Sequence, residues 1–489
     1  MSARLTPLAG LLALALSGCT TGPKYQRASV PVPPQWEAPQ PWRPGAPKDA
    51  IPKGEWWKVF QDEELNALET KALAANETLH SAAARYEQAR ALTTLALSSL
   101  YPQMAVAPLA ERQRLSGNRP PNNNQQNLTP VSQNNVLLPF TVSYEADLFG
   151  RRRRSIEASQ AALQESAADL ENVRLVITAE LAADYYSLRR LDSELAILHR
   201  TIESLEKGLQ LVRARHDGGI ASGLDVAQEE TLLESTRTQA TLLVQYRDEF
   251  ENALAVLTGV PAPEFHLSAK ELAAAPPSIE TGLPSDLLER RPDVASAERH
   301  MARANAQIGV ARSAYFPSLN LFASGGWQTA DVAKLLNVSS TFWALGATAA
   351  EAIFTGGARR AQVQYAKSGY DAAVADYRAT VLNSFREVED DLSGLRVLNE
   401  ATESQARAVA AARRALDIAT SRYTGGLVSY LDVVSAQQTL LNNERQAAQL
   451  QGERLVTSVL LVKALGGGWD AGSLASAQIK PAVKTAFQP

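Results

Sequence analysis

The chain has 489 residues and carries 48 lysines and arginines against 52 aspartates and glutamates, which gives a formal net charge of −4. Charges of both signs are mixed along the chain, and this excludes the concentrated basic surface of a nucleic-acid-binding protein. The single cysteine, Cys19, excludes a disulfide framework and a thiolate metal site.

The N-terminal residues have the pattern of an export signal. Arg4 precedes an apolar run from Leu8 to Leu16, and small residues lead from there to Cys19. Because Leu16-Ser17-Gly18-Cys19 is similar to the lipobox of bacterial lipoproteins, we expect residues 1–18 to be a signal peptide and Cys19 to be lipidated. The alternatives are an ordinary signal peptide and a short buried helix.

Residues 19–61 follow as the expected lipid anchor and a strap. Prolines recur from Pro23 to Pro52, and this excludes a helix and favours an extended segment along the outside of the body. After Trp56-Trp57, the pattern predicts a helix from about Asp62 to Leu100, which Tyr101-Pro102 ends.

A duplication organises the rest of the chain. The segment from Arg215 to Val226 recurs from Arg422 to Val433, with its paired glycines and its Leu-Asp-Val at the same spacing. A repeat this long is half of a domain rather than a solenoid unit, so we expect an internally duplicated fold. The predicted divisions are a first repeat at 62–259, an inter-repeat segment at 260–285, a second repeat at 286–467 and a C-terminal tail at 468–489.

Each repeat contains a long helical hairpin. Between Gly150 and Asp217 there is no proline, and apolar residues recur at the spacing of a coiled-coil seam. This predicts one helix of roughly 100 Å, a turn at Gly218-Gly219 and a return helix to about Leu257. The second repeat predicts the same arrangement, with a long helix from Gly357 to Tyr423, a turn at Gly425-Gly426 and a return to Leu465.

Two pairs of strands precede the long helices. Apolar and polar residues alternate from Val136 to Phe149, as in a transmembrane strand with one face toward lipid and one toward a lumen. We expect Glu145 and Asp147 to face that lumen, and residues 112–135 to form an exterior loop. The alternative is a small soluble sheet. The predicted strand pairs are 103–111 with 136–149, and 318–328 with 342–354.

Four strands cannot close a barrel around a channel, so several copies are required. The predicted fold is a mixed α/β membrane protein in which three protomers form a barrel of about twelve strands, four from each, continued by a long α-helical coiled-coil tunnel.

No catalytic constellation is present. The five histidines form no ligand-spaced cluster, and there is no phosphate-binding loop. We therefore expect no enzyme activity, no metal and no cofactor beyond the covalent lipid on Cys19.

The expected gate lies where the return helices begin, at Leu224-Asp225 and Leu431-Asp432. In a threefold assembly each aspartate forms a ring of carboxylates, which can control a constriction. The alternative is that both aspartates are first-turn residues stabilised by the helix dipole, and the two interpretations are compatible.

Taken together, these features resemble the outer membrane factor (outer membrane efflux protein) family, of the TolC-like, OprM/NodT lipoprotein type. The matching motifs, in order, are Gly22-Pro23-x-Tyr25, Trp56-Trp57-x-x-Phe60-x-Asp62, Asp147-Leu148-Phe149-Gly150-Arg151, Arg290-Arg291-Pro292-Asp293-Val294, Ala304-Asn305-Ala306-x-Ile308-Gly309 and the two Gly-Gly/Leu-Asp-Val turns.

The resemblance implies a homotrimer in the outer membrane, in contact with its lipid, whose helical domain lies in the periplasm. It implies two partners, a periplasmic adaptor protein and an inner-membrane transporter of the resistance-nodulation-division (RND) type. It also implies a gate leucine, matched by Leu431, and an aspartate one turn later, where this chain has Ser435. The tips that would dock the adaptor are Gly218, Gly219, Ile220, Ala221 and Ser222, and Gly425, Gly426, Leu427, Val428 and Ser429; alternatively, their glycines only serve the turns.

The function that follows is the exit duct of a tripartite efflux pump for drugs or other small toxic solutes. The alternatives are a TolC-type duct for type I protein secretion and a non-conducting structural envelope lipoprotein.

Overall fold

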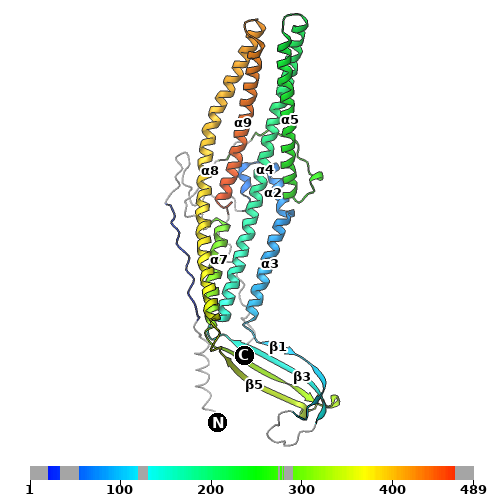
Figure 1. The fold of residues 1–489 in the computed structure, drawn as a ribbon, viewed down its shortest axis with the longest axis vertical. Helices are drawn as coiled ribbons and strands as arrows, with labels where there is room; N and C mark the ends of the chain where they lie inside the picture. Colours follow the sequence, from blue (N-terminus) through cyan, green and yellow to red (C-terminus); the bar gives the residue numbers. More distant parts are fainter. Residues whose placement is uncertain are drawn as a thin grey trace.

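The computed structural model describes residues 20–33, 54–118, 130–273, 276–277, 279 and 290–468. The molecule is long and has two parts, a β-sheet at one end and a bundle of helices that extends away from it (Figure 1). The turns between the helices of each hairpin lie at the end opposite the sheet. The two ends therefore present different surfaces, a sheet edge at one and helix turns at the other.

The helices of the two halves match in length. The long helices α4 (Arg151–Asp217) and α8 (Ala358–Thr424) each have 67 residues. The return helices α5 (Gly223–Leu257) and α9 (Tyr430–Ala464) have 35, and the helices before the long ones, α3 (Glu77–Ser98) and α7 (Pro292–Ser313), have 22. α3 and α7 pack along the part of the long helices near the sheet, and α5 and α9 pack along the far part.

The first helix is shorter than the sequence predicts. Instead of one helix to Leu100, the chain forms α2 (Glu63–Ala75) and α3, with Asn76 in extended conformation between them. The Asn76 side chain accepts a hydrogen bond from the Leu79 amide and donates one to the Leu257 carbonyl, both at 3.0 Å. This buried asparagine caps α3 and ties it to the end of α5, so the helix breaks there.

The sheet contains the strands β1 (Gln103–Val106), β2 (Leu109–Leu115), β3 (Val131–Ala146), β4 (Ser318–Thr329) and β5 (Thr341–Ala350). β1 and β2 lie end to end along β3, and β4 joins β3 to β5, all antiparallel. The predicted strand 103–111 is therefore two strands, interrupted at Ala107-Pro108, because proline has no N–H for the ladder.

The predicted bounds of the other strands also change. β3 starts five positions before Val136, in the stretch predicted as loop, because polar side chains pair there as well: Asn135 donates to Glu111 and accepts from Gln328, at 3.0 and 2.9 Å. β3 ends at Ala146 and β5 at Ala350, before the predicted ends at 149 and 354, because the chain turns toward α4 and α8. Short 3-10 helices in the described residues include η2 (Ala262–Glu264), η4 (Val332–Lys334) and η5 (Val338–Ser340).

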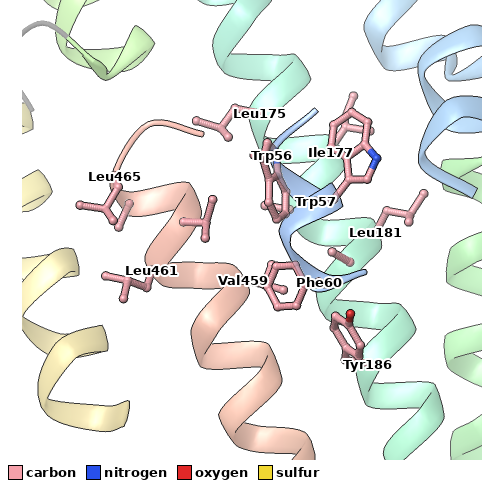
Figure 2. Close-up of a cluster of buried hydrophobic side chains, with 14 of the residues drawn as sticks. Trp56, Trp57, Phe60, Leu175, Ile177, Leu181, Tyr186, Val459, Leu461 and Leu465 are labelled. Atoms are coloured by element: carbon pink, nitrogen blue, oxygen red, sulfur yellow. The ribbon is translucent and has the colours of Figure 1, made fainter. Parts of the chain in front are cut away.

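The main apolar core lies midway along the bundle. The 3-10 helix η1 (Trp56–Phe60) lies beside α4 and points Trp56 and Phe60 toward the space between α4 and α9, whereas the Trp57 ring points away from α9 (Figure 2). Trp56 and Trp57 are 2% and 1% exposed, and the Trp56 indole donates to the Thr178 hydroxyl at 3.1 Å. This one core joins the first repeat, through α4, to the second, through α9.

The strap crosses α7 next to the start of α4. Gly22 adopts φ +102°, and a Cβ there would lie 2.6 Å from the Gly309 Cα, so both glycines permit a close backbone approach. The buried Arg154 donates to the carbonyl oxygens of Thr21, Gly22 and Pro23. These contacts bring the Gly22-Pro23 motif against the motif from Ala304 to Gly309.

Candidate functional site

The two tips have the same backbone geometry. The amide of Ile220 donates to the Arg215 carbonyl and that of Gly219 to the His216 carbonyl, both at 2.8 Å. Leu427 and Gly426 repeat these bonds to Arg422 and Tyr423. This is the Schellman arrangement, in which a left-handed residue ends a helix, and Gly219 and Gly426 have φ of +72° and +73°.

Beyond each glycine an apolar side chain points outward. Ile220 is 72% exposed and Leu427 is 71% exposed. The residues around them are small, and a Cβ added at Gly219 or Gly426 would meet no neighbouring atom within 4 Å. The glycines thus serve the turn, whereas the isoleucine and leucine form an exposed apolar surface at the end of the bundle.

The gate aspartates stabilise the starts of their helices. Asp225 accepts a hydrogen bond from the Ser222 amide, and the Ser222 hydroxyl accepts one from the Asp225 amide, which is a complete capping box. In the second repeat the Ser429 hydroxyl donates to the Asp432 carboxylate at 2.8 Å. The structural role of these carboxylates is therefore present within one protomer, and Asp225 is the more fully engaged.

Leu224 and Ser435 lie in one groove between α5 and α9. This open groove has a volume of about 660 Å³, and Leu224, Leu232, Val434 and Ser435 are among its lining residues. Leu224 is 65% exposed and Leu431 is 53% exposed. The fold therefore brings the predicted gate residues of both repeats to the same level of the bundle.

A set of side chains behind the tips was not predicted. Glu229 of α5 is fully buried next to Tyr430, the first residue of α9, and Tyr430 packs against Tyr423 at the end of α8. A comparison of the two repeats in the sequence could have drawn attention to these residues. Tyr430 stands where the first repeat has Gly223, and Glu229 stands where the second repeat has Ala436. Both residues thus differ from their counterparts in the other repeat, and both lie in this contact between the halves.

Glu145 and Asp147, predicted to face a lumen, both meet the arginines at the start of α4. Glu145 forms ion pairs with Arg151 and Arg152. Asp147 lies just beyond β3, where its carboxylate accepts the amides of Arg152 and Arg153 at 3.0 Å and so caps α4. This basic run is thus paired within the protomer and is not a free cationic patch.

The remaining predictions concern lipid and ions. Cys19, the expected lipidation site, lies outside the described residues, as do the signal peptide, much of the strap and the tail beyond 468. Within the described ranges, no helix is long and apolar enough to cross a membrane. No group of histidine, cysteine and acidic residues suited to a metal ion occurs in that same part of the chain.

Comparisons with known proteins relate this geometry to a family. The sequence model of the family described as "Outer membrane efflux protein" matches residues 68–260 and 283–467, once in each repeat. The chain belongs to the outer membrane efflux protein family. As a member of this family it is an outer-membrane protein, the channel component of a tripartite efflux pump, and its family role is transport rather than catalysis.

Individual relatives extend along nearly the whole chain. The toluene efflux pump outer membrane protein TtgF of Pseudomonas putida is 34% identical over 474 residues, which cover 94% of this efflux protein and 96% of the relative. The outer membrane protein OprJ of Pseudomonas aeruginosa is 32% identical over 468 residues, with 94% and 95% coverage.

Solved structures agree with the fold. The outer-membrane channel OprN superimposes with a TM-score of 0.86 at 29% identity and covers 92% of this efflux protein and 100% of its own chain. The Campylobacter jejuni CmeC outer membrane channel superimposes with a TM-score of 0.83 at 26% identity, with 93% and 96% coverage. The TolC-like arrangement of helical bundle and sheet is thereby shown, while the OprM/NodT subtype stays a prediction.

Proposed function

We propose that three copies of this efflux protein assemble into one continuous exit duct. The observation that carries the proposal is the open sheet: β1 and β2 pair only with β3, and β5 pairs only with β4, among the described strands. Both edges therefore offer unpaired backbone groups, and a closed ring of sheets removes such edges in lipid. The helical hairpins then continue the ring as a tunnel into the periplasm.

The tips are the proposed docking surface for a periplasmic adaptor protein. Ile220 and Leu427 are exposed apolar side chains at the end of the molecule farthest from the sheet. Behind the adaptor we place an inner-membrane RND transporter, since relatives such as TtgF are named as components of efflux pumps. The transporter supplies the energy, and the duct itself needs no cofactor.

The proposed gate consists of Leu224, Asp225, Leu431, Asp432 and Ser435. Leu224 and Leu431 are exposed in the protomer, so they can meet their symmetry copies and narrow the tunnel. Asp432 is the better candidate for a charged ring, because among the described residues its carboxylate accepts a hydrogen bond from the Ser429 hydroxyl alone, whereas Asp225 completes a capping box.

We also propose that Cys19 carries the lipid that tethers the strap to the outer membrane. For the solute, the relatives are named for toluene, pyoverdine and antibiotic efflux, which favours small organic molecules over a secreted protein. Those names also support a conducting duct over a purely structural lipoprotein.

Single-channel conductance in a planar bilayer tests the duct and its gate. We expect a small conductance for the wild type and at least about a twofold rise in an Asp225→Asn, Asp432→Asn variant, because asparagine keeps the helix cap but removes the charge. The matched variant with alanine at both positions removes the cap as well. A rise with alanine alone would show that helix capping, rather than charge, holds the gate, and a silent wild type and variants would contradict a conducting duct.

A further inference from the structure

Glu229 is a buried acid with no ion-pair partner among the described residues. Its side chain lies in α5 behind the first tip and is 0% exposed. Neither carboxylate oxygen has a partner in good hydrogen-bond geometry within the described part of the chain. A buried ionised carboxylate normally pairs with a cation or accepts several hydrogen bonds, so this position favours the neutral acid.

The neighbours of Glu229 come from two other helices. The Tyr430 hydroxyl and the Gln437 amide of α9 lie close enough to bond to the carboxyl group. On the α4 side a Glu229 oxygen lies against Gly208, where a side chain would collide with it, and the Tyr430 hydroxyl lies 3.4 Å from the same point. Gly208 therefore makes the space in which Glu229 and Tyr430 meet.

The contact extends across all four helices of the two hairpins. The Tyr430 ring lies 4.8 Å from that of Tyr423, at the end of α8. The Arg215 guanidinium of α4 lies 4.8 Å from the centre of the Tyr423 ring, in a cation–π contact. We call Arg215, Tyr423, Tyr430 and Glu229 the tip brace, because one residue from each helix connects the hairpins just behind the turns.

We propose that Glu229 is a positioning residue for the gate: as a neutral acid it holds the start of α9 against α5, and on ionisation it releases α9. This inference rests on the proposed gate, because α9 begins at Tyr430 and carries Leu431, Asp432 and Ser435. The signal is a change in pH, which adds a proton to Glu229 or removes it, and the element that moves is the first turns of α9.

The sign of the effect follows from burial. Burial raises the pKa of Glu229 above its ordinary value, and the nearby Tyr430 and Gln437 side chains offset this rise only in part. Burial also raises the pKa of Tyr430 and of Tyr423, and the charge of the neighbouring Asp225 adds to both shifts. Arg215, the cation of the brace, offsets part of the rise at Tyr423. Glu229 thus holds its proton more tightly when the brace is packed than when α9 is released, so rising pH favours the release of α9.

Hydrogen–deuterium exchange of residues 430–437 tests the proposal in the lipid-embedded full-length protein. Wild type is compared with Glu229→Gln, a neutral isostere, at each pH from about 5 to about 9, so that the intrinsic exchange rate cancels. We expect equal protection at low pH. As pH rises from the ordinary to the raised carboxyl pKa, the ratio of the wild-type exchange rate to that of the variant should rise by up to about tenfold per pH unit. Above the raised pKa this ratio should level off.

Two variants separate this role from general packing. Glu230→Gln removes the neighbouring acid, which pairs with Arg213 at the surface, and should behave as the wild type at every pH. Tyr430→Phe removes the hydroxyl and should raise exchange already at low pH. A wild type that matches Glu229→Gln at every pH, or differs from it by a constant factor, would overturn the proposal. Because exchange does not depend on conduction, failure of the duct in the bilayer experiment is a distinct result.

Discussion

At the scale of single residues, some buried ionisable side chains have ion-pair or hydrogen-bond partners among the described residues and others have none. Arg189 is 2% exposed and pairs with Glu64 and Asp192, and Glu194 of α4 is fully buried but accepts from Arg190 and Arg445. Each of these buried charges thus has an oppositely charged partner, and the Glu194–Arg445 pair also joins the first repeat to the second. Glu69 of α2 differs, because it is fully buried and neither oxygen has a hydrogen-bond partner in the described residues.

We expect Glu69→Gln to stabilise the protein at neutral pH. Burial raises the pKa of Glu69 well above its ordinary value, so the folded protein holds a proton that the unfolded chain releases, and stability falls as pH rises through this window. Removing that cost should raise the free energy of unfolding by about 1–3 kcal/mol near pH 8 and by less near pH 5. The measurement is the thermal unfolding midpoint at both pH values. Glu63→Gln, exposed on the same helix, is the control, and a gain that is the same at both pH values would contradict the explanation.

At the scale of elements, the duplication sets the lengths of the helices, and the turns set their ends. The tips of both repeats use one left-handed glycine each, at Gly219 and Gly426, with no neighbouring atom that would hinder a side chain. The adjacent Gly218 has a φ of −79°, which any residue can adopt. Of these two neighbouring glycines, only Gly219 has a backbone conformation that requires glycine.

We therefore predict that Gly219→Ala loosens the first tip, whereas Gly218→Ala does not. An L-residue in the left-handed region costs about 1 kcal/mol, which corresponds to a roughly fivefold rise in local opening. Hydrogen exchange of the Ile220 and Ala221 amides, which both donate to the Arg215 carbonyl, measures it. If both alanine variants opened the turn equally, the backbone conformation would not be the cause.

At the scale of the whole molecule, the described sheet is open at both edges. Large apolar side chains on the strands stay in contact with solvent, among them Trp343 at 83% and Leu345 at 77% exposed. Exposed apolar surface of this kind, next to the unpaired edges of the described sheet, supports the proposed assembly of several copies in lipid.

Native mass spectrometry of the protein released from detergent tests this directly. We expect a mass of three mature chains, each carrying acyl groups if Cys19 is lipidated, because only a closed ring leaves no free edge in the membrane. A Cys19→Ala variant should keep the trimeric mass and lose the added lipid mass. A monomer as the main species under gentle release would contradict the proposed assembly.

The sequence by itself determined the duplication, the helical hairpins, the turn glycines and the pairs of strands. These follow from local rules, namely periodicity, proline and glycine positions and alternation, which act between residues near in the chain. The family could be predicted for the same reason, since its motifs are local and ordered, and the comparisons confirm it.

Only the tertiary structure decided which distant residues meet. Asn76 breaks a helix because Leu257 lies beside it, Arg154 holds the strap by its carbonyl groups, and Glu229 meets Tyr430 across two hairpins. Their sequence separations are large, and no local pattern states the pairing. Burial and hydrogen bonding between segments are properties of the packed bundle, and they set the role of each buried polar side chain.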